Sequence, residues 1–307
     1  MKTKELGQMV DLSRIATEQR NPDTLDIDRV STLEMVREIN REDAKIALAV
    51  EAVLPSIAEA IDRTAERLHD GGRLIYVGAG TSGRLGILDA SECPPTYSAP
   101  PEMVQGLIAG GKTAIFKAVE GAEDSRELGR EDLVNLELNS RDVVCGLAAS
   151  GRTPYVLGAM AYAREVGALV LSITCCPGSE VDRAADIGMA PCPGPEAITG
   201  STRMKSGTAQ KMVLNMLSTG VMVKLGKVYS NLMVDVQPSN EKLIQRCIRI
   251  VCQAAETDET SAREALEKCG YRCKTAIVMI RRHCDAAAAE EALKAHDGRV
   301  AGAAGEA

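Results

Sequence analysis

The chain has 307 residues, of which 45% are hydrophobic and 26% are charged, and its formal net charge is −7. Tryptophan is absent and Phe116 is the only phenylalanine, so the chain offers no aromatic platform for single-stranded nucleic acid. The negative charge excludes a global basic field suited to DNA, RNA or anionic membranes. An anionic small molecule would need a local binding site.

We expect neither a membrane span nor a signal peptide. No apolar run approaches the about 20 residues of a membrane span, and the polar residues 1–5 lack the apolar core of a signal peptide. We therefore expect a cytoplasmic protein that binds neither membrane nor nucleic acid. Its ten cysteines are scattered without a CxxC pair and only three histidines are present, which predicts reduced thiols, no metal site and no cofactor.

The N-terminal part of the chain, to about residue 41, is polar and irregular, with a turn signal at Asn21-Pro22-Asp23. We interpret it as an arm or lid. Between residues 43 and 68 the apolar positions follow helical spacing, which Pro55 interrupts. This pattern predicts a kinked helix or two abutting helices.

Short apolar runs then alternate with helical patterns. The runs predict strands over residues 73–77, 103–109, 142–147, 168–174 and 187–190. They are apolar on both faces, as in a buried parallel sheet, and a segment such as 154–165, which follows Thr153 as N-cap, suits a crossover helix. The sequence predicts an α/β fold, a doubly wound parallel sheet of about five strands with helices on both faces. Such sheets bind ligands beyond the carboxyl ends of their strands.

The last third of the chain reads as helical. Residues 204–225 are apolar on nearly every side, which predicts a buried helix partly covered by another subunit. Amphipathic helices are expected over 240–256, 260–269, 273–282 and 284–295, with a frayed tail from 298. The predicted organisation is an N-terminal arm (1–42), an α/β domain (43–237) and a small helical C-terminal module (238–307).

A glycine-rich loop follows the first predicted strand. Its sequence, Gly78-Ala79-Gly80-Thr81-Ser82-Gly83, matches GxGxxG. A dinucleotide-binding domain would carry a carboxylate at the end of the second strand, whereas that strand ends in Ala109-Gly110-Gly111-Lys112. We favour a helix N-terminus at which backbone N–H groups, Thr81 and Ser82 donate hydrogen bonds to a phosphate. A bare strand-to-helix turn is the alternative.

The third predicted strand ends in a similar loop, Ser150-Gly151-Arg152-Thr153. Two hydroxyl-bearing loops on β–α units define a pocket better than one does, and a phosphate monoester on a small molecule would suit them. The Walker pattern GxxxxGK[ST] is absent from the sequence. A nucleoside triphosphate is therefore not the expected ligand.

Two acidic positions are candidates for proton transfer. Glu92 precedes Cys93-Pro94-Pro95, so we expect it to end a helix, where the helix dipole disfavours a carboxylate. Glu123 lies in an acidic turn that also reads as a helix cap, with Asp124 or Ser125 as the N-cap. Spacing alone assigns catalysis to neither glutamate.

These motifs resemble those of the bacterial N-acetylmuramic acid 6-phosphate etherases. The resemblance runs from about Leu12 through the C-terminal helices and is strongest over residues 74–97, 118–126, 148–155 and 194–211. Residues 194–205 resemble a signature shared with glucokinase regulatory proteins, and the core resembles a sugar isomerase (SIS) domain. The resemblance implies a carbon–oxygen lyase that removes D-lactate from a muramic acid phosphate in amino-sugar catabolism and cell-wall recycling.

The resemblance also implies roles for individual residues. Glu92 matches the family's proton donor and Glu123 its other catalytic residue, and we expect Glu123 to take the proton from C2. In related SIS domains the two loops hold the phosphate. The expected substrate-binding residues are Gly80, Thr81, Ser82, Gly83, Ser150, Gly151 and Thr153.

Arg203 and Lys205 precede the long helix, where they are expected either to neutralise a substrate anion or to pair with Glu196. We expect a homodimer with its pockets near the interface, because SIS units usually pair. A phosphosugar-sensing regulatory protein and an aldose–ketose phosphosugar isomerase are the alternative functions.

Overall fold

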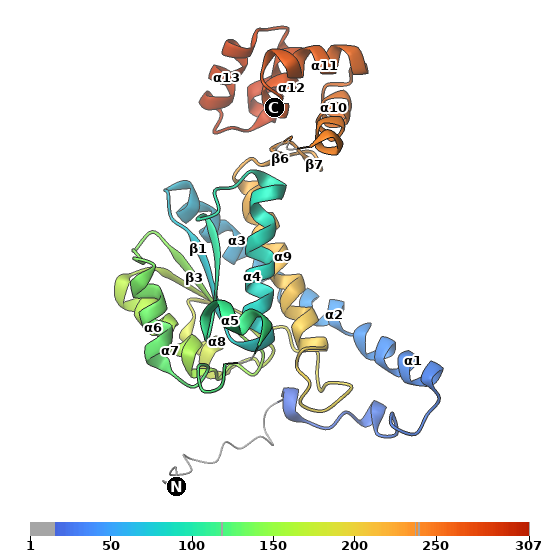
Figure 1. Cartoon of the computed structure of the whole chain (residues 1–307), viewed down its shortest axis with the longest axis vertical. Coiled ribbons are helices and arrows are strands. Elements are labelled where there is room, and N and C mark those ends of the chain that lie inside the picture. Colours follow the sequence, from blue (N-terminus) through green and yellow to red (C-terminus); the bar gives the residue numbers. More distant parts are fainter. Residues whose placement is uncertain (1–15, 118, 237, 239, 307) are drawn as a thin grey trace.

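The computed structural model describes residues 16–117, 119–236, 238 and 240–306 and is shown in Figure 1. Its centre is a parallel sheet in the order β2-β1-β3-β4-β5. Its strands are β1 (Leu74–Gly78), β2 (Val104–Ile108), β3 (Val143–Ala148), β4 (Leu169–Thr174) and β5 (Ile187–Met189). All five predicted strands are confirmed.

Helices cover both faces of the sheet. Successive side chains of a strand point to opposite faces, so each strand contributes to two hydrophobic cores. Leu74 and Tyr76 of β1 join a core with α3 (Leu54–His69), α4 (Gly80–Tyr97) and α9 (Lys205–Lys224). Ile75 and Val77 join a second core with α6 (Arg126–Asn135) and α7 (Pro154–Val166). The short helices α5 (Gly111–Phe116) and α8 (Glu180–Ala184) complete the layers. The predicted doubly wound α/β fold and a largely buried helix near 204–225 are confirmed, and the expected cover of that helix by another subunit stays a prediction.

The N-terminal segment is more regular than its sequence suggested. The segment begins with two 3-10 turns, η2 (Ala16–Glu18) and η3 (Pro22–Thr24), and continues with the helix α1 (Thr32–Asp43). Ser31 caps the N-terminus of α1, because its hydroxyl accepts a hydrogen bond from the Glu34 backbone N–H. The expectation of irregular chain to about residue 41 is therefore wrong; residues 1–15 lie outside the described residues. The helices α2 (Ile46–Glu51) and α3 abut at Pro55, as predicted.

The C-terminal module has its own hydrophobic core. It contains α10 (Glu241–Ala255), α11 (Glu259–Lys268), α12 (Cys273–Arg282) and α13 (Ala286–Ala295), which confirm the predicted helices. A hairpin of β6 (Val228–Tyr229) and β7 (Leu232–Met233) precedes them and was not predicted. The expected frayed tail is wrong, because α14 (Val300–Ala304) buries Val300 and Ala303 in this core. The boundaries at 42 and 237 stay predictions.

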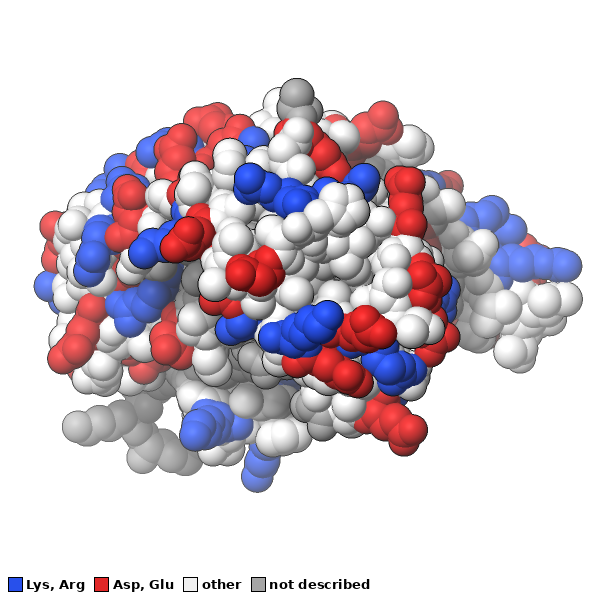
Figure 2. Space-filling view, turned by 90° about the horizontal axis from the view of Figure 1, so that it is seen from above, with Lys and Arg blue, Asp and Glu red and all other residues white. Residues whose placement is uncertain are grey.

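The module and the N-terminal helices lie at opposite ends of the molecule (Figure 1). Over the face drawn in Figure 2, basic and acidic side chains are interspersed rather than gathered into a field of one sign. No helix in the described part of the chain is both long and apolar enough to cross a membrane.

Candidate active site at the carboxyl ends of the strands

The glycines of the first loop let α4 begin directly against β1. A Cβ atom on Gly78 would lie 2.7 Å from the backbone nitrogen of Gly83, and one on Gly83 would lie 2.8 Å from the carbonyl oxygen of Gly78. Gly80 has a φ of +52° and nothing within 4 Å of its Cβ position. The GxGxxG match thus reflects close packing at two positions and a left-handed, open backbone at the third.

The two hydroxyls of this loop have different surroundings. The Ser82 hydroxyl is buried and donates to Oε1 of Gln210 over 2.7 Å, while the Gln210 amide nitrogen donates to the Ile173 carbonyl over 3.0 Å. That second bond fixes the orientation of the Gln210 amide, so its oxygen must be the acceptor for the Ser82 hydroxyl. The Ser82 proton is therefore not available to a phosphate in this geometry. Thr81 is half-buried, and its hydroxyl has no hydrogen-bond partner among the described residues.

The second loop, between β3 and α7, is held by Gly151. Its φ is +68°, a Cβ there would overlap the Ser179 hydroxyl, and its carbonyl accepts a hydrogen bond from the Val181 N–H over 3.0 Å. Ser150 and Thr153 are half-buried, and within the described residues neither hydroxyl has a partner. Thr153 occupies the N-cap position of α7 without capping it. Both hydroxyls are therefore free to donate.

Since β1 and β3 are neighbours, their loops meet at one edge of the sheet. Beside the second loop opens a cavity of about 190 Å³, lined by Ser150, Arg152, Cys176 and Arg183 among others. Arg152 is exposed and makes no hydrogen bond or ion pair in the described part of the chain. Hydroxyl donors and a cation suit a phosphate monoester.

Glu123 lies at the same edge. Its carbonyl oxygen accepts a hydrogen bond of 3.0 Å from the backbone N–H of Tyr155, in the first turn of α7. Its side chain is exposed. Ser125 caps α6 by accepting from the Leu128 N–H over 3.2 Å, as one of the predicted caps requires. The backbone of Glu123 is thus fixed next to the second loop while its carboxylate is free to meet a ligand.

Glu92 lies elsewhere. The expectation that a helix ends near it is wrong, because α4 continues through Pro94 and Pro95 to Tyr97. Ser82 is at the start of this helix and Glu92 is ten residues further on, which corresponds to about 15 Å along the axis. The Glu92 side chain is exposed, as is its neighbour Leu88. Glu92 is therefore not brought to the loops of its own chain.

The end of α4 that carries Glu92 is joined to the C-terminal module. The hydroxyl of Ser98, the C-cap of α4, donates to the carbonyl oxygen of Asp235. The Asp235 carboxylate forms ion pairs with Lys227 over 2.9 Å and Lys274 over 2.8 Å. Glu92 and the module therefore share one end of the α/β domain, and the loops after β1 and β3 occupy the other.

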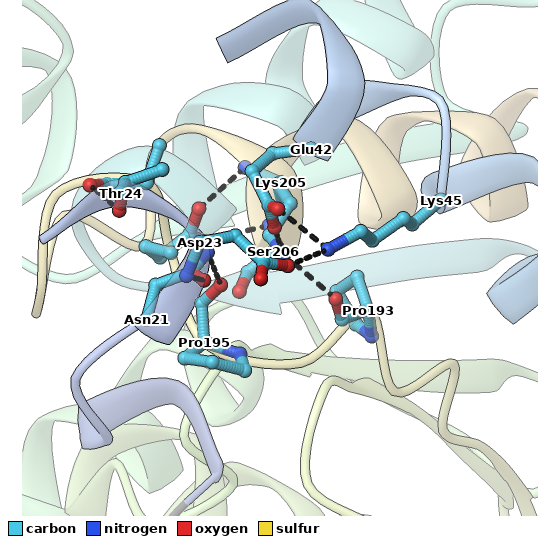
Figure 3. Close-up of polar contacts among 11 residues, drawn as sticks. Asn21, Asp23, Thr24, Glu42, Lys45, Pro193, Pro195, Lys205 and Ser206 are labelled. Atoms are coloured by element: carbon cyan, nitrogen blue, oxygen red, sulfur yellow. Dashed lines mark hydrogen bonds and ion pairs between the residues drawn. The ribbon is translucent and has the colours of Figure 1, made fainter. Parts of the chain in front are cut away.

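Lys205 has a structural role (Figure 3). Its side chain is 1% exposed, and its ammonium group donates to the Glu42 carboxylate over 2.6 Å and to the Pro193 carbonyl over 3.0 Å. Glu196 instead accepts from the backbone N–H groups of Lys205 and Ser206, and so caps α9. The predictions that the Lys205 side chain binds substrate or pairs with Glu196 are both wrong for this geometry.

The partner of Lys205 comes from the segment expected to be an arm. Burial raises the pKa of Glu42, but hydrogen bonds from Lys205, Lys45 and Asn21 outweigh it and hold this pKa at about 2. The Thr24 hydroxyl donates to the Ala197 carbonyl over 2.9 Å. The N-terminal segment thus fastens the loop before α9. No pattern in the sequence pairs Glu42 with Lys205.

Arg203 remains available for a ligand. It is exposed, and within the described residues it makes neither a hydrogen bond nor an ion pair. Its role in substrate binding stays a prediction.

One buried carboxylate, Asp89, was not predicted from the sequence. It accepts hydrogen bonds from Tyr76 over 2.9 Å, from Asn215 over 2.7 Å and from Ser218 over 3.1 Å. Burial raises the pKa of Asp89, and these donors partly oppose that effect. Asp89 follows the buried Ser82 at a helical spacing, so both side chains lie on the same face of α4. This spacing is the signal from which its burial could have been predicted. It ties β1, α4 and α9 together.

Comparison with known proteins shows which family the chain belongs to. The chain is 59% identical to an N-acetylmuramic acid 6-phosphate etherase of Photorhabdus laumondii, over 95% of this chain and 97% of that protein. It is 60% identical to one of Clostridium beijerinckii, over 89% of this chain and 90% of that protein. The chain belongs to the N-acetylmuramic acid 6-phosphate etherase family. The resemblance expected from the motifs is confirmed.

Family models agree with this assignment. Residues 127–220 match the SIS domain, residues 56–164 the N-terminal SIS domain of glucokinase regulatory protein, and residues 230–277 the C-terminal lid domain of that protein. Among solved structures, a phosphoheptose isomerase from Neisseria gonorrhoeae is 17% identical, with a TM-score of 0.50 over 62% of this chain and 98% of the other. It shares the fold of the α/β domain.

Proposed function

We propose that this member of the family cleaves the lactyl ether of N-acetylmuramic acid 6-phosphate, giving N-acetylglucosamine 6-phosphate and D-lactate. It would act as a carbon–oxygen lyase of amino-sugar catabolism and cell-wall recycling, in the cytoplasm. The observation that carries this proposal is one edge of the sheet at which the unpartnered hydroxyls of Thr81, Ser150 and Thr153 accompany the exposed Glu123.

The reaction needs a carbonyl group, because an unactivated alkyl ether resists water. The open form of the sugar carries an aldehyde at C1, which acidifies the proton on C2. A base removes that proton while an acid protonates the lactyl oxygen on C3, so that the C3–O bond breaks and lactate leaves. Water then adds to C3 of the unsaturated aldehyde and the proton returns to C2. Paired acid and base groups are sufficient for these steps.

Glu123 suits the role of the C2 base. Its fixed backbone and exposed carboxylate lie beside the loops that would hold the phosphate. Glu92 suits protonation of the departing lactate and activation of the incoming water, but the length of α4 separates it from the loops of its own chain. A hexose phosphate is far shorter than the about 15 Å between Ser82 and Glu92 along that helix.

We therefore propose that a second copy of the chain supplies Glu92, so that the homodimer is the working unit. An apolar groove of about 670 Å³ between α3 and α9 offers a surface for this pairing. Leu54, Ile57, Ile61, Met212 and Met216 line it. Such a groove in contact with solvent favours association.

The proposal is tested by incubating the purified protein with N-acetylmuramic acid 6-phosphate, with and without a chelator, and identifying the products. Release of D-lactate and N-acetylglucosamine 6-phosphate supports it. Formation of a ketose phosphate without lactate would show an isomerase instead. Binding of the phosphosugar without any turnover would show a phosphosugar sensor. The matches to the glucokinase regulatory protein models are the reason to test for this alternative.

A further inference from the structure

The C-terminal module carries a row of cations that the proposed chemistry has not used. Lys242, Arg246 and Arg249 lie on α10 at spacings of four and three residues, which places them on one side of the helix. The opposite side, with Cys247, Ile248 and Val251, is buried in the core of the module. The cationic row is therefore held on a rigid support and faces away from that core.

A cavity of about 490 Å³ accompanies this row. It lies between α10 and the β6–β7 hairpin, with Leu232, Met233 and Ile250 as apolar lining and Asn231, Gln245 and Gln253 as polar lining. Its volume is in the range of small-molecule sites, about 300–1,000 Å³, and a few polar groups over an apolar surface are typical of them.

The part of the chain that the structure describes supplies no counterion to the three cations. Within the described residues, none of Lys242, Arg246 and Arg249 makes a hydrogen bond or an ion pair, and all three are exposed. Other arginines of the module are matched, for example Arg263 with Glu259 and Arg281 with Glu306. Among the described residues, no carboxylate lines the cavity. An unneutralised cationic cavity on a chain of net charge −7 points to an anionic ligand.

The position of the cavity suggests which anion it meets. The module is joined to the Glu92 end of α4 through Ser98 and Asp235, away from the phosphate loops of the same chain. If a second copy supplies Glu92 to a bound substrate, its module approaches that substrate from the same side. The substrate of the proposed reaction carries both a lactyl carboxylate and a phosphate.

We propose that this cationic groove, formed by Lys242, Arg246 and Arg249 beside the β6–β7 hairpin, binds an oxyanion of the phosphosugar held on the loops of a second copy. The inference rests on the proposed function. It makes Lys242 and Arg246 substrate-binding residues, and it gives the C-terminal module a direct part in the site.

The test compares Arg246→Gln and Lys242→Gln with a control, Lys268→Gln, which removes an exposed cation from α11 on the same module. We expect each groove variant to raise the KM for N-acetylmuramic acid 6-phosphate about tenfold or more, with the melting temperature unchanged. The control keeps the wild-type KM. The KM of both groove variants staying at the wild-type value would overturn the inference.

A second arm identifies the anion. The inhibition constant of N-acetylglucosamine 6-phosphate, which lacks the lactyl carboxylate, is measured for the same variants. If it stays at the wild-type value while KM rises, the groove binds the carboxylate; if both rise together, it binds the phosphate. Wild-type protein that releases no lactate would instead refute the proposed function, so the two failures are distinguishable.

Discussion

The two ends of α4 differ in almost every respect. At its start, tightly packed glycines, a committed Ser82 hydroxyl and the neighbouring loop of β3 build a rigid edge with Glu123 beside it. At its other end, Glu92 is exposed, has no partner in the described residues and lies beside the module. The first end brings its loops and Glu123 together within one chain, whereas the second holds Glu92 away from those loops. The 18 residues of α4 thus place the two glutamates of the proposed reaction on different surfaces of one chain.

The most severe test of this comparison removes the two carboxylates separately. Glu123→Gln and Glu92→Gln should each lower kcat by about 10²–10⁴-fold, the usual contribution of a general acid or base. In solvent D₂O, Glu92→Gln should still exchange the C2 proton without releasing lactate, whereas Glu123→Gln should lose both. Glu127→Gln, an exposed position in the first turn of α6, is the control. Exchange retained by E123Q and lost by E92Q would reverse the roles.

A second large effect is expected on stability. Lys205→Met removes the buried ammonium partner of Glu42 and leaves that carboxylate with the more exposed Lys45, which should lower the free energy of unfolding by about 3 kcal/mol. Denaturant unfolding measures the loss, and Lys211→Met, exposed on the same helix, is the control. This outcome replaces the expectation from sequence that the substitution mainly raises KM. A raised KM at unchanged stability would restore a binding role for Lys205.

The same ion pair predicts a pH dependence. The pKa of Glu42 is about 2, against an ordinary value of 4.5, so the folded state favours the ionised form. This contributes about 3 kcal/mol of stability that is present above pH 4.5 and is lost as the pH falls toward 2. Glu42→Gln should therefore be much less stable than the wild type at pH 7, with the difference narrowing below pH 4.5. A difference that stays constant with pH would contradict the assignment.

The smallest effects separate the two serines. Ser150→Ala should raise KM about tenfold with little change in stability, because its hydroxyl is free for a phosphate. Ser82→Ala should leave KM near the wild-type value and lower the free energy of unfolding by about 1–3 kcal/mol, since Gln210 loses a buried partner. Steady-state kinetics and thermal unfolding of both variants decide the matter. An exchange of the two phenotypes would mean that Ser82 rotates toward the ligand.

Much of this fold could be predicted from the sequence because it depends on local patterns. The apolar runs of the strands, the cap at Ser125 and the glycines around Gly80 all act within a few residues. What could not be predicted depends on distant partners. Glu42 and Lys205 are far apart in the chain yet form one buried pair, and a polar segment gives no sign of such burial.

The candidate site shows the same division. Loop composition identified the residues at the carboxyl edge, and family resemblance identified both glutamates. Neither could show that α4 holds Glu92 away from Glu123, because that separation follows from helix length and from which edge each loop occupies. The distinction between the committed Ser82 and the free Ser150 likewise depends on Gln210, a residue of a helix much later in the chain.

The central claim is that the two glutamates of one working site come from different copies of the chain. It is tested most directly by co-expressing E92Q and E123Q subunits with different affinity tags and assaying the purified mixed dimers for D-lactate release. A shared site leaves one of the two sites in each mixed dimer with both glutamates, so the account predicts recovery to about half of the wild-type rate, from two parents that are each inactive. If every site lay within one chain, no mixed dimer would contain an intact pair, and activity that stays at the parental level would contradict the account.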